Sequence, residues 1–345
     1  MVRYVSRNWA SLGASLIVIG LSFMVSLAQA STLSHVRENG YVNCGVSDSK
    51  IGFSEQDGKD SWKGLGVSFC RAIAAAIFND INKVKFVALS PDDAISALQS
   101  GNIEILMNSV SWTLKHDAGL GLLFTGILLH DGQGFMVPKK LGISSALELS
   151  GASICVLKEQ SLELKASKFF KSKKMPFKLI PYDTRENVTK AYQSGLCNVF
   201  TDNILQLAIE RVSFDAPGEH IILPDILSKR PKGPIVRQGD DQWFNLVKWV
   251  LFALINAEEL GITRDNVSSF ETSEDPEVRA LLGQDDQFGK FLGLPKDWAK
   301  NMLLKIGNYG ELFDQNMGQR SPLKIDRGPN KLWDQGGLLF APPLN

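Results

Sequence analysis

The sequence predicts an α/β fold built from two similar lobes, and three observations support this. Short β-rich runs alternate with amphipathic segments along most of the chain, as in folds with mainly parallel sheets. The pentapeptide Ala-Leu-Gln-Ser-Gly at 97–101 returns as Ala-Tyr-Gln-Ser-Gly at 191–195, 94 residues later. Each half also holds two of the four cysteines. A glycine between a helix and a strand is ordinary C-cap chemistry, so the repeat suggests equivalent lobes without proving them.

The expected strands and helices alternate in a similar order in both halves. In the first half, strands are expected at 41–46, 84–89 and 103–107, with helices at 67–78, rich in small residues, and at 91–99, begun by Pro-Asp-Asp. In the second half, strands are expected at 153–157, 177–182 and 198–200, with helices at 161–170 and 185–193. After residue 240 the pattern becomes helical, at 242–259 and 294–306, and the aromatic residues of the first helix suit a buried face.

The first 30 residues have the order of a secretory signal peptide. Arg3 and Arg7 precede an apolar run at 12–27, which ends in Ala-Gln-Ala at 28–30. The alternative is a membrane anchor or a buried helix, but the run is shorter than the ~20 residues that span a bilayer. Cleavage is therefore expected after Ala30.

The charges of the chain are nearly balanced. Removal of the signal segment, with Arg3 and Arg7, leaves 35 of the 37 basic residues against 37 acidic residues. This balance disfavours nucleic-acid binding.

The four cysteines predict two disulfides. An even number of cysteines in an exported chain favours disulfide bonds. Neither the cysteines nor the four histidines show the close spacing that is typical of a metal site. Three pairings are possible. Cys44 with Cys70 and Cys155 with Cys197 are preferred, because their spacings of 26 and 42 residues place one crosslink in each half. No metal and no cofactor are expected.

Two proline-punctuated segments, at 135–138 and 233–237, are the candidate crossings between the lobes. The first lobe would then comprise 31–137 and 233–345, with a helical C-terminal extension, and the second lobe 138–232. Two lobes that share two strands have the layout of a binding protein that closes about a hinge. The expected site is the cleft between them.

Five stretches of the sequence, at 64–78, 99–117, 130–137, 233–263 and 293–343, resemble the periplasmic amino-acid-binding proteins of ABC uptake systems, solute-binding family 3. The resemblance is greatest to the general L-amino-acid-binding branch of this family. The resemblance implies a two-lobe periplasmic binding protein, or Venus-flytrap, fold with two hinge strands. It also implies a periplasmic location, an amino acid or related small polar solute as ligand, an inner-membrane ABC permease as partner, a monomer, and no catalysis.

The same resemblance implies the ligand residues. In this family an Arg fork, hydroxyls and backbone N–H groups hold a zwitterion's carboxylate, and an Asp holds its ammonium. The positions that match the carboxylate site are Ser109, Ser111, Thr113, His116 and, at the start of a helix in the second lobe, Ser161. The ammonium position matches Asn203, with Asp202 one residue earlier. Phe53 and Trp112 are candidate aromatic platforms, for which packing in the core is an equal alternative.

Several of these positions depart from the family pattern. His116 replaces the Arg, and a neutral imidazole offers one donor and no fixed charge. Glu159 and Gln160 precede Ser161 in place of a Gly-Thr-Thr turn, and Gly66 and Ser68 replace two acids. Asp202 could replace the missing Asp only through a bulge, because successive strand side chains face opposite ways. We therefore expect a different ligand, or weaker binding, than in an ordinary amino-acid receptor.

Two other functions remain open at this stage. One is a sensory or interaction protein that keeps the fold and does not serve transport. The other is a cleft enzyme of hydrolase or lyase type, with His116 and either Glu159 or Asp202 as acid and base. The enzyme would require a histidine and a carboxylate within about 3 Å of each other or of one ligand atom.

Overall fold

The computed structural model describes residue 1 and residues 31–47, 50–58, 61–108, 110–284 and 288–344. The expected signal segment, apart from Met1, and the candidate ligand residue Ser109 lie outside the described residues. Within those ranges, no helix combines the length and the apolarity that crossing a bilayer requires.

The first sheet has the strand order β4-β1-β5-β14-β6. The first three strands run parallel, and β14 pairs antiparallel with β5 and β6. The helix α3 begins where expected, because the side chain of Ser90 accepts a hydrogen bond from the N–H of Asp93 and Pro91 occupies its first turn. The strands are β1 (Val42–Ser47), β4 (Val84–Leu89), β5 (Ile105–Met107), β6 (Leu122–Phe124) and β14 (Ile235–Arg237), and the helices are α2 (Leu65–Phe78) and α3 (Pro91–Ser100).

The second sheet repeats this arrangement in the order β10-β9-β11-β8-β12. Its first three strands are parallel, and β8 pairs antiparallel with β11 and β12. Gly101 and Gly195, the last residues of the two similar pentapeptides, follow α3 and α6 with φ of 85° and 78°. The predicted equivalence of two lobes is confirmed. The elements are β8 (Gln133–Pro138), β9 (Ala152–Leu157), α5 (Gln160–Ser172), β10 (Phe177–Tyr182), α6 (Arg185–Gln193), β11 (Val199–Asn203), α7 (Ile204–Val212) and β12 (His220–Ile222).

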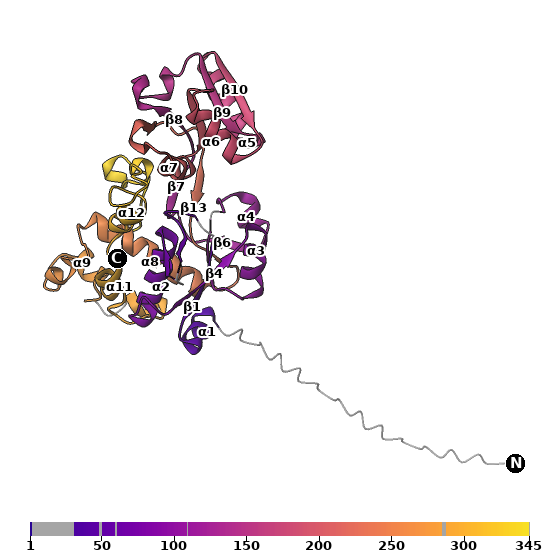
Figure 1. Ribbon diagram of the computed structural model, residues 1–345. Helices are drawn as coiled ribbons and strands as arrows, with labels where there is room; N and C mark the ends of the chain where they lie inside the picture. Colours follow the sequence, from indigo (N-terminus) through magenta and orange to yellow (C-terminus); the bar gives the residue numbers. More distant parts are fainter. Residues whose placement is uncertain (2–30, 48–49, 59–60, 109, 285–287, 345) are drawn as a thin grey trace. The chain divides into compact units, whose positions relative to one another are not determined.

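A separate antiparallel pair, β7 (Leu129–Asp131) and β13 (Arg230–Lys232), connects the two sheets. Figure 1 shows both strands between the sheets. The chain passes along β7 directly into β8, which belongs to the second sheet, and returns along β13 to β14 of the first sheet. The segment at 135–138, expected as a crossing, therefore lies inside the second sheet, and the connecting strands come a few residues before each expected crossing.

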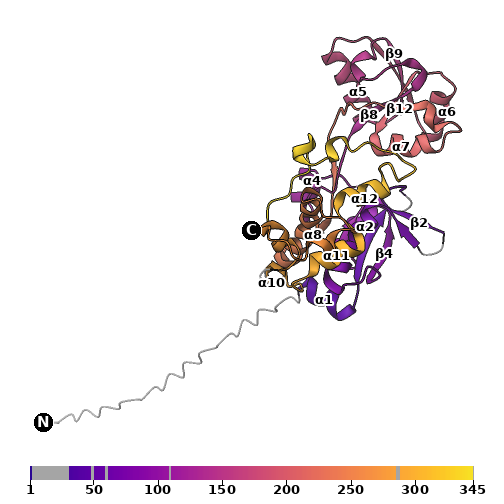
Figure 2. The same cartoon turned by 90° about the vertical axis from the view of Figure 1, so that its left-hand side faces the viewer.

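The C-terminal helices cover one side of the first sheet. Helices α8, α11 and α12 contact α2, and both views show these four helices together (Figures 1 and 2). Trp243 of α8 is buried and donates its indole N–H to the carbonyl of Glu104, as expected for a core residue. Helix α11 begins four residues later than expected, after Pro295. The extension comprises α8 (Asp241–Glu259), α9 (Pro276–Leu281), α10 (Phe288–Leu292), α11 (Trp298–Ile306) and α12 (Tyr309–Asn316).

Both predicted disulfides are present. Cys44 of β1 is bonded to Cys70 of α2, with Cα atoms 6.3 Å apart. Cys155 of β9 is bonded to Cys197, which precedes β11, with Cα atoms 5.7 Å apart. Each crosslink lies within one lobe, and all four cysteines are buried. Shorter elements complete the described fold: α1 (Thr32–Asn39), β2 (Glu55–Asp57), β3 (Ser61–Lys63) and α4 (Leu114–Ala118).

Candidate ligand-binding site

The segment after β5 holds the predicted carboxylate residues Ser111, Thr113 and His116. Thr113 is the exposed N-cap of α4, and its hydroxyl accepts a hydrogen bond from the backbone N–H of His116 (3.3 Å). The Nδ1 atom of His116 lies 2.9 Å from the carbonyl oxygen of Ser111. A carbonyl can only accept, so Nδ1 is the donor, and in the neutral ring Nε2 is left as an acceptor. Neutral His116 therefore offers a carboxylate no donor at its free nitrogen.

Arg230 of β13 brings a cation to this same segment. Its Nε donates to the hydroxyl of Ser111 (3.3 Å), and the carbonyl of the next residue, Pro231, accepts from the N–H of Trp112 (2.9 Å). Among the described residues, no carboxylate lies within ion-pair distance of the Arg230 guanidinium. Arg230 was not predicted as a site residue, because it is 119 positions from Ser111. The basic run at 229–232, beside an expected crossing, was the available signal.

The two candidate aromatic platforms lie in different surroundings. Phe53 is fully buried in the core of the first lobe, so its ring has no exposed face. Trp112 is partly buried and stacks on Phe124, with ring centroids 5.1 Å apart and an interplanar angle of 6°. Its indole N–H donates to Asp117 (3.0 Å). Trp112 thus lies within the carboxylate segment and is partly exposed, whereas Phe53 has no exposed surface.

Asp202 lies in β11 of the second lobe and is almost completely buried. Its Oδ2 is 2.7 Å from a guanidinium nitrogen of Arg185, and its Oδ1 accepts from the N–H of Asn203. The pairing of β11 with β8 continues without interruption from Phe200 to Asn203, so no bulge exchanges the sides of Asp202 and Asn203. The carboxylate is thus paired within its own lobe with Arg185, which also lies 3.5 Å from the carboxylate of Glu210.

Asn203 and Gln133 form a pair of buried amide groups at the adjoining ends of β11 and β8. They are directly opposite each other in the register of these strands. Gln133 is fully buried and donates from Nε2 to Thr201 (3.0 Å) and to a backbone carbonyl of α5 (2.9 Å). Its Oε1 and the Oδ1 of Asn203 are buried and accept no hydrogen bond from the described residues. Leaving a buried acceptor unpaired is costly, so both oxygens favour a donor group in this place.

The start of α5 is exposed. Ser161 lies in its first turn, and Glu159 occupies the N-cap without a side-chain capping bond. Among the described hydrogen bonds, none joins His116 to Glu159 or to Asp202; the ring of His116 faces the Ser111 carbonyl and Asp202 faces Arg185. The residues that an acid–base pair would need are thus each engaged elsewhere or exposed.

A buried ion pair joins the two connecting strands. Lys232 Nζ of β13 lies 2.9 Å from Asp131 Oδ2 of β7, and their side chains are 4% and 2% exposed. The second oxygen of Asp131 accepts from the N–H groups of Gly132 (2.9 Å) and Leu205 (3.3 Å), the latter in the first turn of α7. The Asp131 carboxylate therefore links β7 to both β13 and the start of α7.

Lys50, in the loop after β1, faces this ion pair and the neighbouring charges. Burial, followed by the charge of Lys232, lowers the pKa of the Lys50 ammonium to about 8, while Asp131 and Asp202 act in the opposite direction. Arg230 also lowers it. Lys50, like Arg230, has no carboxylate within ion-pair distance in the part of the chain that the structure describes. The sequence analysis did not single out Lys50 as a candidate.

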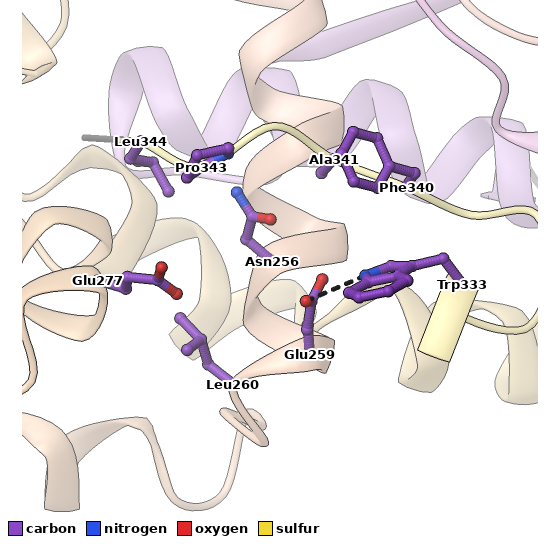
Figure 3. Close-up of a pocket in the computed structure, with 9 residues that line it drawn as sticks. All are labelled: Asn256, Glu259, Leu260, Glu277, Trp333, Phe340, Ala341, Pro343 and Leu344. Atoms are coloured by element: carbon purple, nitrogen blue, oxygen red, sulfur yellow. Dashed lines mark hydrogen bonds between the residues drawn. The ribbon is translucent and has the colours of Figure 1, made fainter. Parts of the chain in front are cut away.

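Two hollows of the described surface lie away from these residues. Figure 3 shows one of about 200 Å³ between α8 and the C-terminal segment, where the indole N–H of Trp333 donates to Glu259 (3.1 Å). Another, of about 260 Å³, lies between α7 and residues 324–329. Neither is lined by a predicted ligand residue. The described residues contain no group of three or more His, Cys, Asp or Glu side chains suited to a metal ion.

Comparison with known proteins identifies the family. Residues 42–265 match the bacterial extracellular solute-binding proteins, family 3. The chain is 45% identical over 337 residues to the general L-amino acid-binding periplasmic protein AapJ of Rhizobium johnstonii, covering 97% of this chain and 98% of that one. It is 39% identical over 324 residues to the glutamate/glutamine/aspartate/asparagine-binding protein BztA of Rhodobacter capsulatus, covering 94% and 96%.

A solved structure extends this similarity to three dimensions. It is an ABC transporter periplasmic binding protein from Brucella ovis with glutathione bound, which matches with a TM-score of 0.77 and 43% identity and covers 92% of this chain and 100% of that one. Fold and sequence thus agree over nearly the whole length of the chain. The chain belongs to the bacterial extracellular solute-binding proteins of family 3.

Proposed function

We propose that this protein is the periplasmic solute-binding component of an ABC importer and that it takes an amino acid or a related small polar solute between its lobes. The observation that carries the proposal is the hydrogen bond from Arg230, on one of the two strands that connect the lobes, to Ser111 of the predicted carboxylate segment. AapJ and BztA bear the names of amino-acid-binding proteins, and the Brucella ovis protein was solved with glutathione. A solute that carries both a carboxylate and an ammonium is consistent with the names of the first two proteins and with the ligand of the third.

The proposal also covers export, the permease partner and the boundaries of the lobes. We infer that the segment 1–30 directs export and is removed after Ala30, and that the mature protein acts as a monomer with an inner-membrane permease. We place the lobe boundaries at β7 and β13, slightly before the expected limits of 137 and 233, since β8 pairs within the second sheet. The cleft carries out no catalysis in this proposal.

The ligand set is proposed to differ from that of an ordinary amino-acid receptor. Arg230 supplies the carboxylate cation in place of an arginine at position 116, together with Ser111. Ser109 and Thr113 of the same segment, and Ser161 at the start of α5, remain proposed donors. Asn203 takes the ammonium with a neutral oxygen, and Trp112 borders the solute. Asp202, paired with Arg185, does not contact the solute in this proposal.

A thermal-shift and calorimetric screen tests this function. The mature protein, unfolded, dialysed and refolded to remove any co-purified solute, is titrated with the common L-amino acids and with reduced glutathione. At least one is expected to bind with micromolar or tighter affinity, which is about −8 kcal/mol or more of binding free energy. Failure of every compound, with a cooperative melting transition showing that the protein has refolded, would exclude an amino-acid receptor and favour the sensory protein.

A further inference from the structure

The C-terminal segment at 323–330 contacts both lobes, and we call it the strap. It follows α12, and Ile325 donates its N–H to the carbonyl of Met317, directly after that helix (2.8 Å). The family match ends at residue 265, so the strap belongs to a part of the chain that this match does not cover. Both views show the C-terminal segment next to α7 of the second lobe (Figures 1 and 2).

The strap is bound to the first lobe and to a connecting strand. The Arg327 guanidinium forms an ion pair with Glu258 of α8 (3.0 Å) and lies over the ring of Tyr309, 5.2 Å from its centroid. Asn330 is 4% exposed, and its side-chain amide accepts from the N–H of His130 in β7 (2.7 Å) and donates to the carbonyl of the same residue (3.0 Å). These bonds hold the strap against the first lobe and β7.

Arg211 of α7 connects the second lobe to the strap. Its guanidinium donates to the backbone carbonyls of Leu323 and Lys324. Lys324 has a φ of 43°, in the left-handed region that favours glycine, so the strap has a strained backbone at this contact. In the described part of the chain, every hydrogen bond between the strap and the second lobe comes from Arg211.

The position of Arg211 makes this contact sensitive to the angle between the lobes. The first turn of α7 lies at the connecting strands, where Leu205 donates its N–H to Asp131 of β7 (3.3 Å). Arg211 comes six residues later in the helix, about 9 Å further along its axis. When the second lobe turns about β7 and β13, Arg211 therefore moves further than Leu205. A hollow of about 260 Å³ between α7 and the strap leaves room for such a movement.

The strap lies away from the helices that carry the proposed ligand residues. Figure 1 shows α4 and α5 to the right of the connecting strands and the C-terminal segment, in yellow, to their left. No hydrogen bond or ion pair between described residues joins α4 to the second lobe, so the cleft is open in this form. Bending that brings α4 and α5 together around a solute moves α7 away from the strap. Arg211 then releases the two carbonyls.

We propose that Arg211 and the strap form a latch that holds the cleft open without solute and that cleft closure must release. The inference rests on the proposed function, because the latch controls solute binding in the same cleft. Only the closed form holds a solute from both lobes, so the apparent affinity falls in proportion to the population of that form. The latch stabilises the open form and therefore weakens the binding of every solute by one common factor.

Arg211→Met tests the latch, because it removes the donors and keeps an apolar side chain on α7. Isothermal calorimetry is expected to show L-glutamate and L-alanine both bound about three- to tenfold more tightly than by the wild type. Arg211→Lys keeps one donor group and is expected to show a smaller gain. Arg264→Met is the matched control, since it removes an arginine bond to the carbonyl of Ile306 (3.0 Å) within the first lobe and changes neither affinity.

Spin labels measure the separation of the lobes without any solute. Lys115 of α4 and Lys168 of α5 are exposed and are replaced by cysteine for labelling. All four native cysteines are in disulfides, so the labels attach to the new thiols. Double electron–electron resonance is expected to show a second, shorter distance in a larger share of Arg211→Met molecules than of wild-type or Arg264→Met molecules. A cooperative melting transition of each variant checks that it is folded.

The outcomes separate the latch from the proposed function. Tighter binding of both solutes by a similar factor, together with the shorter label distance, supports the latch. Unchanged or weaker binding by Arg211→Met, an effect on one solute alone, or an equal effect of Arg264→Met overturns the latch while the proposed function stands. If no compound of the screen binds, the proposed function fails. The label distances of the solute-free protein then decide on the latch, and equal distances in wild type and Arg211→Met overturn it.

Discussion

An Asp131→Ala variant is expected to lose about 3–5 kcal/mol of unfolding free energy, because it leaves the charge of Lys232 buried without its partner. Lys232 is 4% exposed, so water cannot replace the carboxylate without a rearrangement of β7 and β13. The variant also leaves the N–H groups of Gly132 and Leu205 without their acceptor. Equilibrium unfolding in urea, monitored by circular dichroism, measures the loss.

Matched variants separate charge from packing. Asp131→Asn keeps an oxygen for the N–H groups of Gly132 and Leu205 but removes the charge, so it should recover only part of the stability. The double variant Asp131→Ala with Lys232→Met removes both charges and should be more stable than Asp131→Ala alone, since a buried ion pair contributes little net stability. A loss below about 1 kcal/mol for Asp131→Ala would show that this ion pair is not buried in solution.

Removal of either disulfide is expected to cost about 2–4 kcal/mol, chiefly by enlarging the unfolded ensemble. The Cys155–Cys197 bond closes 42 residues and Cys44–Cys70 closes 26, so the first should cost slightly more. The paired variants Cys155→Ala with Cys197→Ala, and Cys44→Ala with Cys70→Ala, are compared with the wild type in guanidinium unfolding. As a control, a reducing agent should destabilise the wild type and each single-disulfide variant. Equal midpoints in all forms would contradict this account.

The repeated part of the fold could be predicted because its signals are local. The Pro-Asp-Asp start of α3 and the glycines at 101 and 195 act within a few residues, and the structure places each element close to its expected bounds. The start of α11 was misplaced, since Pro295 lies within the expected helix and the residue before a proline avoids helical conformation. The role of β7 and β13 was missed because each strand has only three residues, too few for a periodic pattern.

The site could be predicted only where the family pattern is continuous in the sequence. Ser111, Thr113 and His116 lie in one segment, and their departure from the pattern is visible without a structure. Arg230 contacts this segment through a hydrogen bond to Ser111 across 119 residues, and no local motif reports such a contact. The lowered pKa of Lys50 also depends on its burial and on the charges that surround it in space. The pairing of Asp202 with Arg185 likewise depends on how α6 packs against β11.

The central claim is that a solute's carboxylate binds at Ser111 and Arg230, beside the strands that connect the lobes. A crystal structure of the mature protein with its co-purified solute, or with L-glutamate, tests this most directly. The account predicts a carboxylate within hydrogen-bond distance of the Arg230 guanidinium and the Ser111 hydroxyl, and an ammonium facing the amide oxygen of Asn203. A solute bound with Arg230 and Ser111 both free of contact would contradict it.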